Sequence, residues 1–174
     1  TPLYSSAASD VYKRQDEKHT SLWGNQPIKL KHGLHKSALF SDDTLAQLIE
    51  VYPRHAYSIV HVGERNGKRI WREGDISGLT GKQVIEAIAS GRMWLNLRTV
   101  HEIDKRYADV LEEILTEFRA ISGMPPVIAR NAGILISSPN ARVHYHTDLP
   151  GQSLWQIRGQ KRVYVLSLIH ISEP

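Results

Sequence analysis

The sequence predicts an α+β fold in which helices dominate the first part of the chain and strands follow. As far as residue 121 most apolar residues recur at the three-to-four-residue spacing of helices, and from Val127 onward they alternate with a period of two. A chain of 174 residues with 41% hydrophobic and 23% charged residues is long enough to bury a core as one domain. Helices followed by a run of strands indicate helices packed outside a sheet or barrel.

Each expected helix begins after a hydroxyl side chain that can accept a hydrogen bond from the first turn. The three helices are Asp42–Tyr52 after Ser41, Gly81–Ser90 after Thr80, and a long helix after Thr99 that stops at Gly123. In the third helix, Thr99 and Glu102 have the spacing of a capping box. Its apolar face consists of Ile103, Tyr107, Val110, Leu111, Ile114, Leu115, Phe118 and Ile121.

The expected strands are short, rich in β-branched residues and bounded by turn residues. In the first half they are Tyr57–Val62, Arg69–Trp71 paired back across Asn66-Gly67, and Met93–Leu97. In the second half they are Val127–Ala129, Gly133–Ser137, Val143–His146, Ser153–Ile157 and Lys161–Val165. Turns are expected at Pro139-Asn140 and at Arg158-Gly159-Gln160, among others.

Composition excludes some functional classes and leaves others unsupported. The chain has no cysteine, so disulfides and thiolate metal sites are excluded and any metal must be held by His, Asp or Glu. The net charge of +4 comes from scattered basic residues, so a nucleic-acid surface is unsupported. No apolar run approaches the roughly 20 residues of a membrane span, and the N-terminus lacks a secretory-signal pattern. We therefore expect a bacterial cytoplasmic protein.

The chemistry-bearing stretch is His144-Tyr145-His146-Thr147-Asp148. On a strand, side chains two positions apart point to the same face, so His144, His146 and Asp148 would converge on one side. Three titratable groups crowded together call for a cation or water to satisfy them. A polar strand end facing solvent is the structural alternative, and it would be preferred for a single histidine.

This stretch and the residues after it resemble the cupin-like, JmjC-type iron(II)/2-oxoglutarate oxygenases. The family pattern is His-x-Asp followed by a strand with Gln-(Ile/Val)-x-Gly-x-Lys, which His146, Asp148, Gln156, Ile157, Gly159 and Lys161 match here. The resemblance implies that residues 16–165 are part of a cupin (double-stranded β-helix, or jelly-roll) barrel covered by N-terminal helices. It implies an oxidoreductase, a dioxygenase of hydroxylase or demethylase type, with Fe(II) and 2-oxoglutarate as cofactors. The substrate would be a small molecule or a protein side chain, and a homodimer is compatible with the family.

The resemblance assigns individual roles. His146 and Asp148 would be iron ligands, and Lys161, 13 positions after Asp148, would pair with the distal carboxylate of 2-oxoglutarate. We expect His146 and Asp148 to point together into the barrel and Lys161 to face the same lumen from a neighbouring strand. His144 is expected beside the site rather than as a ligand, with Tyr145, Gln156 and Trp155 near it. Trp155 is expected to be a core or pocket-wall residue. Where several relatives have a 2-oxoglutarate-binding hydroxyl, this chain has Val143, and Ser137, Tyr145 or Tyr164 would have to substitute.

Two other readings stay open. His144 and His146 also form a His-x-His pair, typical of metal cupins that do not use 2-oxoglutarate, and Lys161 favours the first reading because such a cupin has no need of a cation at that offset. A non-catalytic cupin module that binds a small ligand is the third reading. The remaining histidines, His32, His35, His55, His61 and His101, are expected to be surface or capping residues.

Both ends of the chain resemble translated sequencing-adapter read-through. These are residues 1–15 (TPLYSSAASDVYKRQ) and residues 166–174 (LSLIHISEP). We therefore expect a metagenomic fragment whose barrel is cut off at its C-terminus, before the third ligand, a distal histidine. An open, half-built barrel would leave a strand edge unpaired, so we expect the fragment to be inactive and prone to aggregation.

Overall fold

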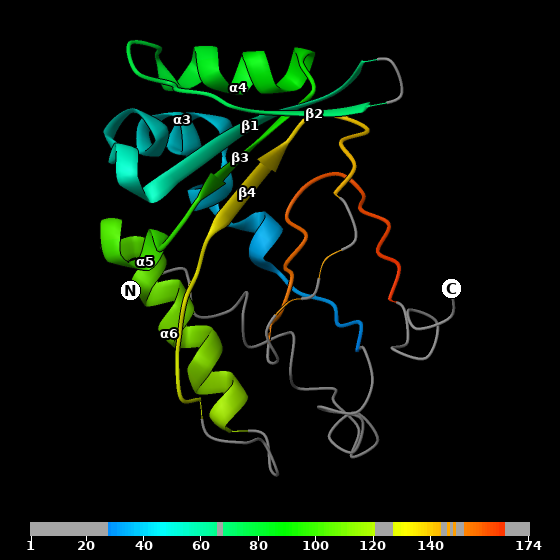
Figure 1. Ribbon diagram of the computed structural model, residues 1–174. Coiled ribbons are helices and arrows are strands. Elements are labelled where there is room, and N and C mark those ends of the chain that lie inside the picture. Colours follow the sequence, from blue (N-terminus) through cyan, green and yellow to red (C-terminus); the bar gives the residue numbers. More distant parts are fainter. Residues whose placement is uncertain are drawn as a thin grey trace. The chain divides into compact units, whose positions relative to one another are not determined.

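The computed structural model describes residues 28–65, 68–120, 127–143, 146, 148 and 152–165 (Figure 1). They divide between two compact units. The sheet unit comprises residues 38–116 and the described residues from 127 to 146, and the motif unit comprises the described residues among 28–37, 117–120, 148 and 152–165.

The sheet unit contains nearly all of the regular structure. Its helical elements are η2 (Ala38–Phe40), α3 (Asp42–Val51), η3 (Arg54–Ala56), α4 (Gly81–Ser90), α5 (Val100–Ile103) and α6 (Lys105–Arg119, whose last residues belong to the motif unit). Its strands are β1 (Tyr57–Arg65), β2 (Lys68–Glu73), β3 (Met93–Leu97) and β4 (Ile134–Ser137). The motif unit contains one short helical turn, η1 (Leu34–Lys36), among its described residues.

The four strands form one antiparallel sheet in the order β2-β1-β3-β4. The hairpin expected across Asn66-Gly67 is confirmed by the pairing of Arg65 with Lys68, although residues 66 and 67 lie outside the described part. The predictions for β3 and α4 agree with the structure residue for residue, and α3 and β4 differ from theirs by one terminal residue each. The α+β class is confirmed.

One face of the sheet is buried beneath α3 and α4. Tyr57 and Ile59 of β1 and Leu95 and Leu97 of β3 lie on this face and belong to one hydrophobic cluster. The helices contribute Leu48 and Ile49 of α3 and Val84 and Ile88 of α4 to this cluster. Leu95 and Leu97 have no exposed surface, and burying one such side chain stabilises the fold by about 2–3 kcal/mol. This core determines where the helices lie on the sheet.

The two helices approach each other most closely at the first residue of α4. A Cβ on Gly81 would lie 2.0 Å from the carbonyl oxygen of Ala46 in α3, a distance that no real side chain tolerates. The Gly81 N–H donates to Glu50 at 3.0 Å. Thr80 and Gln83 close a reciprocal capping box before the first turn, which confirms the cap expected from Thr80.

The capping box expected at Thr99 is wrong. Thr99 has a left-handed backbone (φ +51°), and its side chain makes no capping hydrogen bond. The long helix is instead divided by Asp104, which is extended, into α5 and α6. Asp104 accepts from the N–H of Arg106 at 2.9 Å and so supplies the cap for α6. Ile121, the last residue of the expected apolar face, lies outside the described residues.

Several expected strands do not form. In the described residues, Val127–Ala129, Ser153–Ile157 and Lys161–Val165 have no strand structure, and neither do Val143 and His146. Their alternating pattern is present in the sequence, but a strand also requires a neighbour for its backbone groups. The sheet is therefore open rather than barrel-shaped in the part that the structure describes, with β2 and β4 at its edges. Residues 1–27 and 166–174, which include both suspected read-through segments, lie outside the described residues.

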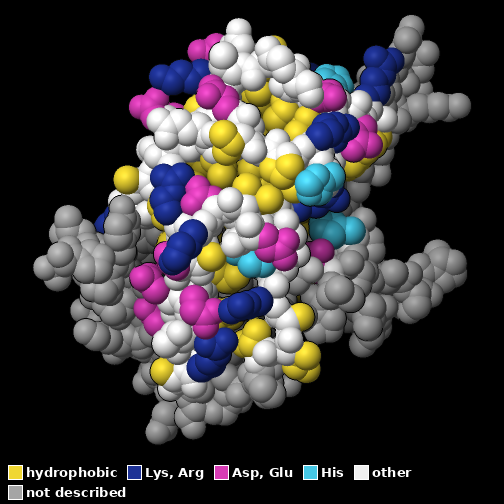
Figure 2. All heavy atoms as spheres, turned by 90° about the vertical axis from the view of Figure 1, so that its left-hand side faces the viewer, with side chains coloured by type: hydrophobic (Ala, Val, Ile, Leu, Met, Phe, Trp, Pro, Cys, Tyr) yellow, Lys and Arg dark blue, Asp and Glu magenta, His cyan; other side chains and the backbone are white. Residues whose placement is uncertain are grey.

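Several charged side chains on the sheet unit form ion pairs with a neighbour of opposite sign. The ion pairs are Arg54–Asp75, Lys82–Asp43, Lys105–Asp109, Arg106–Asp104 and Arg130–Glu112. The face in Figure 2 shows acidic and basic side chains beside one another. No helix in the described residues is both long enough and apolar enough to cross a membrane.

Gly81→Ala should strongly destabilise the sheet unit, because α4 would have to move away from α3 to admit the new methyl group. We expect a loss of about 3 kcal/mol or more in the free energy of unfolding, measured by urea denaturation. Ala89→Ser, at an exposed position of the same helix, is the matched control and should cost about 0.5 kcal/mol. Equal effects of the two substitutions would mean that the contact between Gly81 and Ala46 is not close.

Candidate functional site

The residues predicted to bind a metal and its co-substrate lie at the surface of irregular segments. His146 is exposed in the sheet unit, and Asp148 and Lys161 are exposed in the motif unit. His144 and Tyr145 lie outside the described residues. His146, Asp148 and Lys161 have no strand structure, so the expected strand geometry is not seen at these residues. The roles of His146, Asp148 and Lys161 as ligands stay predictions.

A complete metal-ligand set is not found within the described ranges. No three side chains of His, Cys, Asp or Glu are grouped there so that they could hold a metal ion. The donors that the motif does offer, an imidazole and a carboxylate, suit iron(II) or manganese(II) chemically. The ligand hypothesis therefore depends on sequence spacing.

Trp155 joins three segments of the motif unit that are far apart in the sequence. Its ring packs edge-on against His32 (centroids 5.4 Å apart) and against Phe118 at the end of α6 (6.2 Å). Its indole N–H donates to Ser153 at 3.0 Å. We expected a core or pocket-wall position for Trp155, and the half-buried side chain is a packing residue.

Packing against Trp155 changes the environment of the His32 imidazole. Burial lowers the pKa of His32, and nearby His35 lowers it further, whereas a hydrogen bond with the backbone of Gln156 acts in the opposite direction. Its Nδ1 atom is buried and has no hydrogen-bond partner. His32, expected to be a surface or capping residue, is therefore half-buried. The sequence gives no sign of this, because the contact joins residues more than 100 positions apart.

The turn expected between the two motif segments is present. Gly159 has a left-handed backbone (φ +72°), which a residue with a Cβ adopts only with strain. The side-chain amide of Gln156 donates to the carbonyl of Arg158 at 2.6 Å and closes this turn. Gln156 therefore has a local structural role, and Lys161 follows two residues after the turn.

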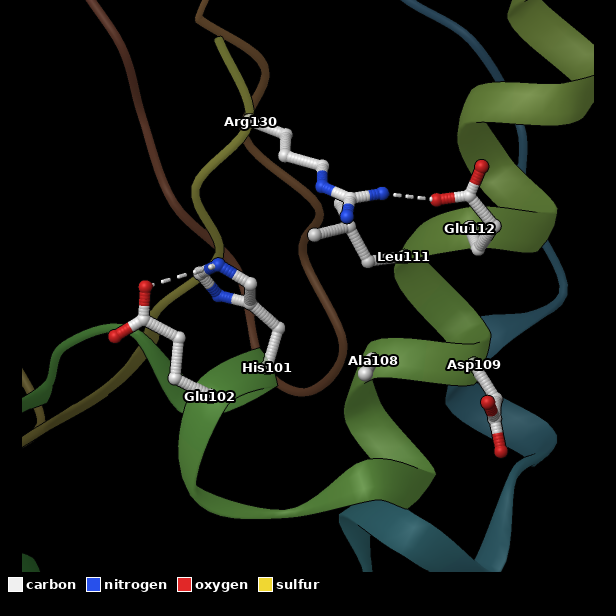
Figure 3. A pocket seen from close by; sticks show the side chains of 7 residues that line it. All are labelled: His101, Glu102, Ala108, Asp109, Leu111, Glu112 and Arg130. Atoms are coloured by element: carbon white, nitrogen blue, oxygen red, sulfur yellow. Dashed lines mark hydrogen bonds and ion pairs between the residues drawn. The ribbon is translucent and has the colours of Figure 1, made fainter.

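The sheet unit has a pocket of about 460 Å³ that the motif does not predict (Figure 3). Ala108 and Leu111 of α6 form the apolar part of its lining, and charged groups surround them. Arg130 binds Glu112 at 2.5 Å, and Asp109, also in the lining, is bound by Lys105 at 2.6 Å. Two of the three carboxylates in the lining thus already have cationic partners.

His101 in this pocket fastens an irregular segment to α5. Its Nδ1 accepts the N–H of Ala132 at 3.3 Å, and the N–H of Val100 donates to the Ala132 carbonyl at 2.8 Å. A neutral imidazole that accepts at Nδ1 carries its proton on Nε2, which lies 3.8 Å from Glu102. The side chain is only 12% exposed and bonds to an irregular segment, so it is neither the surface residue nor the helix-capping residue that we expected. The clamp is structural, because the imidazole nitrogen that could act as a base is already occupied.

No protein-family model, curated protein or solved structure matches the chain.

Acidification should loosen the contact between His32 and Trp155. The pKa of His32 is lowered in the folded protein, so the neutral side chain stabilises the fold fully above the ordinary pKa of histidine, near 6.5. This stabilisation is lost as the pH falls through the pKa of the folded state. The indole N–H signal of Trp155 in a nitrogen–proton NMR spectrum should therefore shift below that pH, and His32→Phe should abolish the shift. His35→Phe is the matched control and should keep it. A shift that persists in His32→Phe would contradict the assignment.

Proposed function

We propose that the chain is part of a non-haem iron(II)- and 2-oxoglutarate-dependent oxygenase of cupin architecture. The observation that carries the proposal is the spacing of His146, Asp148, Gly159 and Lys161 within a single 16-residue stretch. The left-handed Gly159 supports it, since a tight turn at that position is what the pattern requires between its two strands.

The donor types fit the proposed metal. His146 and Asp148 would supply an imidazole and a carboxylate, two members of a two-histidine, one-carboxylate set. The remaining histidine would come from a later strand of a longer chain, with His144 beside the set. Iron(II) with 2-oxoglutarate supplies oxidative chemistry toward a bound small molecule or protein side chain. The part of this chain is to hold the metal on one face and leave the other positions open.

Lys161 has the chemistry that the co-substrate needs. An ammonium group on a flexible stem is a compact point charge suited to a carboxylate. Lys161 is exposed and no described residue forms an ion pair with it, so its charge is available to an anionic ligand. This residue favours the 2-oxoglutarate oxygenase over a His-x-His cupin, in which His144 and His146 would both be ligands.

Asp148→Ala should abolish turnover and His144→Ala should spare most of it. The measurement is succinate formation from 2-oxoglutarate, together with iron content, in the protein expressed with the downstream residues of its natural reading frame. We expect the rate of succinate formation by the Asp148→Ala protein to fall by about 100-fold or more, because a metal ligand is lost. Loss of iron from His144→Ala as complete as that from His146→Ala would favour the His-x-His cupin. Full turnover in Asp148→Ala would refute the proposal.

Lys161→Ala should weaken 2-oxoglutarate binding while leaving iron bound. We expect KM for 2-oxoglutarate to rise by about 10-fold or more, since one charge-assisted contact is removed. Arg162→Ala removes the adjacent exposed cation and is the matched control. An equal rise in KM for both variants would indicate general electrostatic attraction and not a specific site. Stoichiometric iron and turnover in the 174-residue chain alone would mean that no further histidine is needed.

A further inference from the structure

The face of the sheet opposite α3 and α4 has an aromatic and uncharged polar composition. Strand alternation places Ser58 and Val60 of β1, and Trp94 and Asn96 of β3, on this second face. Trp71 of β2 shares the face because it pairs with Val62, two residues after Val60. The remaining described side chains on it are Glu73, Leu135 and Ser137.

The two tryptophans form a right-angled corner. Their centroids are 5.6 Å apart and their planes meet at 87°. β1 lies between β2 and β3, so the two rings can meet only by leaning toward each other over β1. Val60 beneath them is 3% exposed, whereas Trp71 is 57% exposed. The parts of the two rings nearest the sheet cover Val60. Most of the Trp71 ring remains open to a ligand.

Polar side chains beside this corner have unused hydrogen-bonding capacity. The hydroxyls of Ser58 and Ser137 and the amide of Asn96 make no hydrogen bond in the part of the chain that the structure describes. The same holds there for the indole N–H groups of Trp71 and Trp94. Ser58 and Asn96 are half-buried. Half-buried donors and acceptors that have no protein partner can bind water or a ligand.

The described side chains of this face do not favour an anionic ligand. Glu73 is the charged side chain among the described residues of the face, and Arg72 belongs to the opposite face. Single-stranded nucleic acids also stack on aromatic rings, but they require cations along the backbone. An uncharged ligand with many hydroxyl groups matches both the rings and the neutral donors and acceptors.

We propose that the second face of the sheet binds a saccharide or a similar uncharged polyol through Trp71, Trp94 and Asn96. A pyranose has a C–H face that packs on an aromatic ring, and its hydroxyls donate and accept at its rim. The platform extends about 7 Å along a strand and about 10 Å across three strands, which is the footprint of one or two pyranose rings. The proposal is argued from residues outside the His146, Asp148 and Lys161 motif.

Saturation-transfer NMR with maltose and with cellobiose tests the proposal on the full 174-residue chain. At least one disaccharide should bind with a Kd of roughly 1–10 mM, as expected for a shallow site. Saturation should be strongest at the ring C–H protons. Trp71→Ala should weaken binding by about 10-fold or more.

Asn96→Leu keeps the aromatic corner and removes only the amide, so it should weaken binding even if Trp71→Ala perturbs the sheet. Tyr164→Ala removes an aromatic side chain that is 74% exposed outside the sheet, and it should leave binding unchanged. The proposal is overturned if neither disaccharide binds at about 50 mM, well above the expected Kd. It is also overturned if saturation persists in both sheet variants, or if an oligothymidylate binds at this face in place of the sugars.

Discussion

The two central strands, β1 and β3, present an alternating apolar face that must be covered, and the rest of the sheet unit is arranged around that requirement. Leu95 and Leu97 lose all their exposed surface beneath α3 and α4. Each such burial is worth about 2–3 kcal/mol, whereas an exposed ion pair such as Lys105–Asp109 contributes at most about 1 kcal/mol. The core therefore decides the arrangement of the helices, and the surface ion pairs follow it.

Covering this face also imposes the close approach of the two helices. α4 can reach the sheet beside α3 only because Gly81 has no side chain at the contact with Ala46. The polypeptide then passes through β3 and reaches Thr99, whose left-handed backbone turns it into α5. Such a conformation is costly for a residue with a Cβ and persists only when the surroundings enforce it. The clamp between Val100, His101 and Ala132 provides that support, because it ties the start of α5 to the segment that leads into β4.

The second face of the sheet differs from the core in how its polar groups are satisfied. Within the core, Tyr107 donates to the Leu39 carbonyl at 2.7 Å, and burial raises its pKa to about 12. On the second face, Asn96 and Ser58 have no such partners among the described residues. Polar groups that a fold leaves unsatisfied on a half-buried surface are the ones that a ligand can use.

The sequence alone determined most of the local elements between Ser41 and Leu97 and the turn at Gly159. Ser41 and Thr80 identify their helices because a cap is a local hydrogen bond, and Asn66-Gly67 identifies its hairpin because a turn is a local backbone preference. Gly159 identifies a turn for the same reason.

Tertiary structure decided the rest, because the remaining outcomes depend on partners that are distant in the chain. Lys161–Val165 alternates like a strand but has no strand beside it among the described residues, and Asp104 divides the helix that Thr99 was expected to cap. The burial of His32 against Trp155, and that of His101 against Ala132, arise from contacts that no local pattern encodes. Apolar residues that alternate with a period of two show only that a segment can pair as a strand. The fold determines whether a partner strand lies within hydrogen-bonding distance.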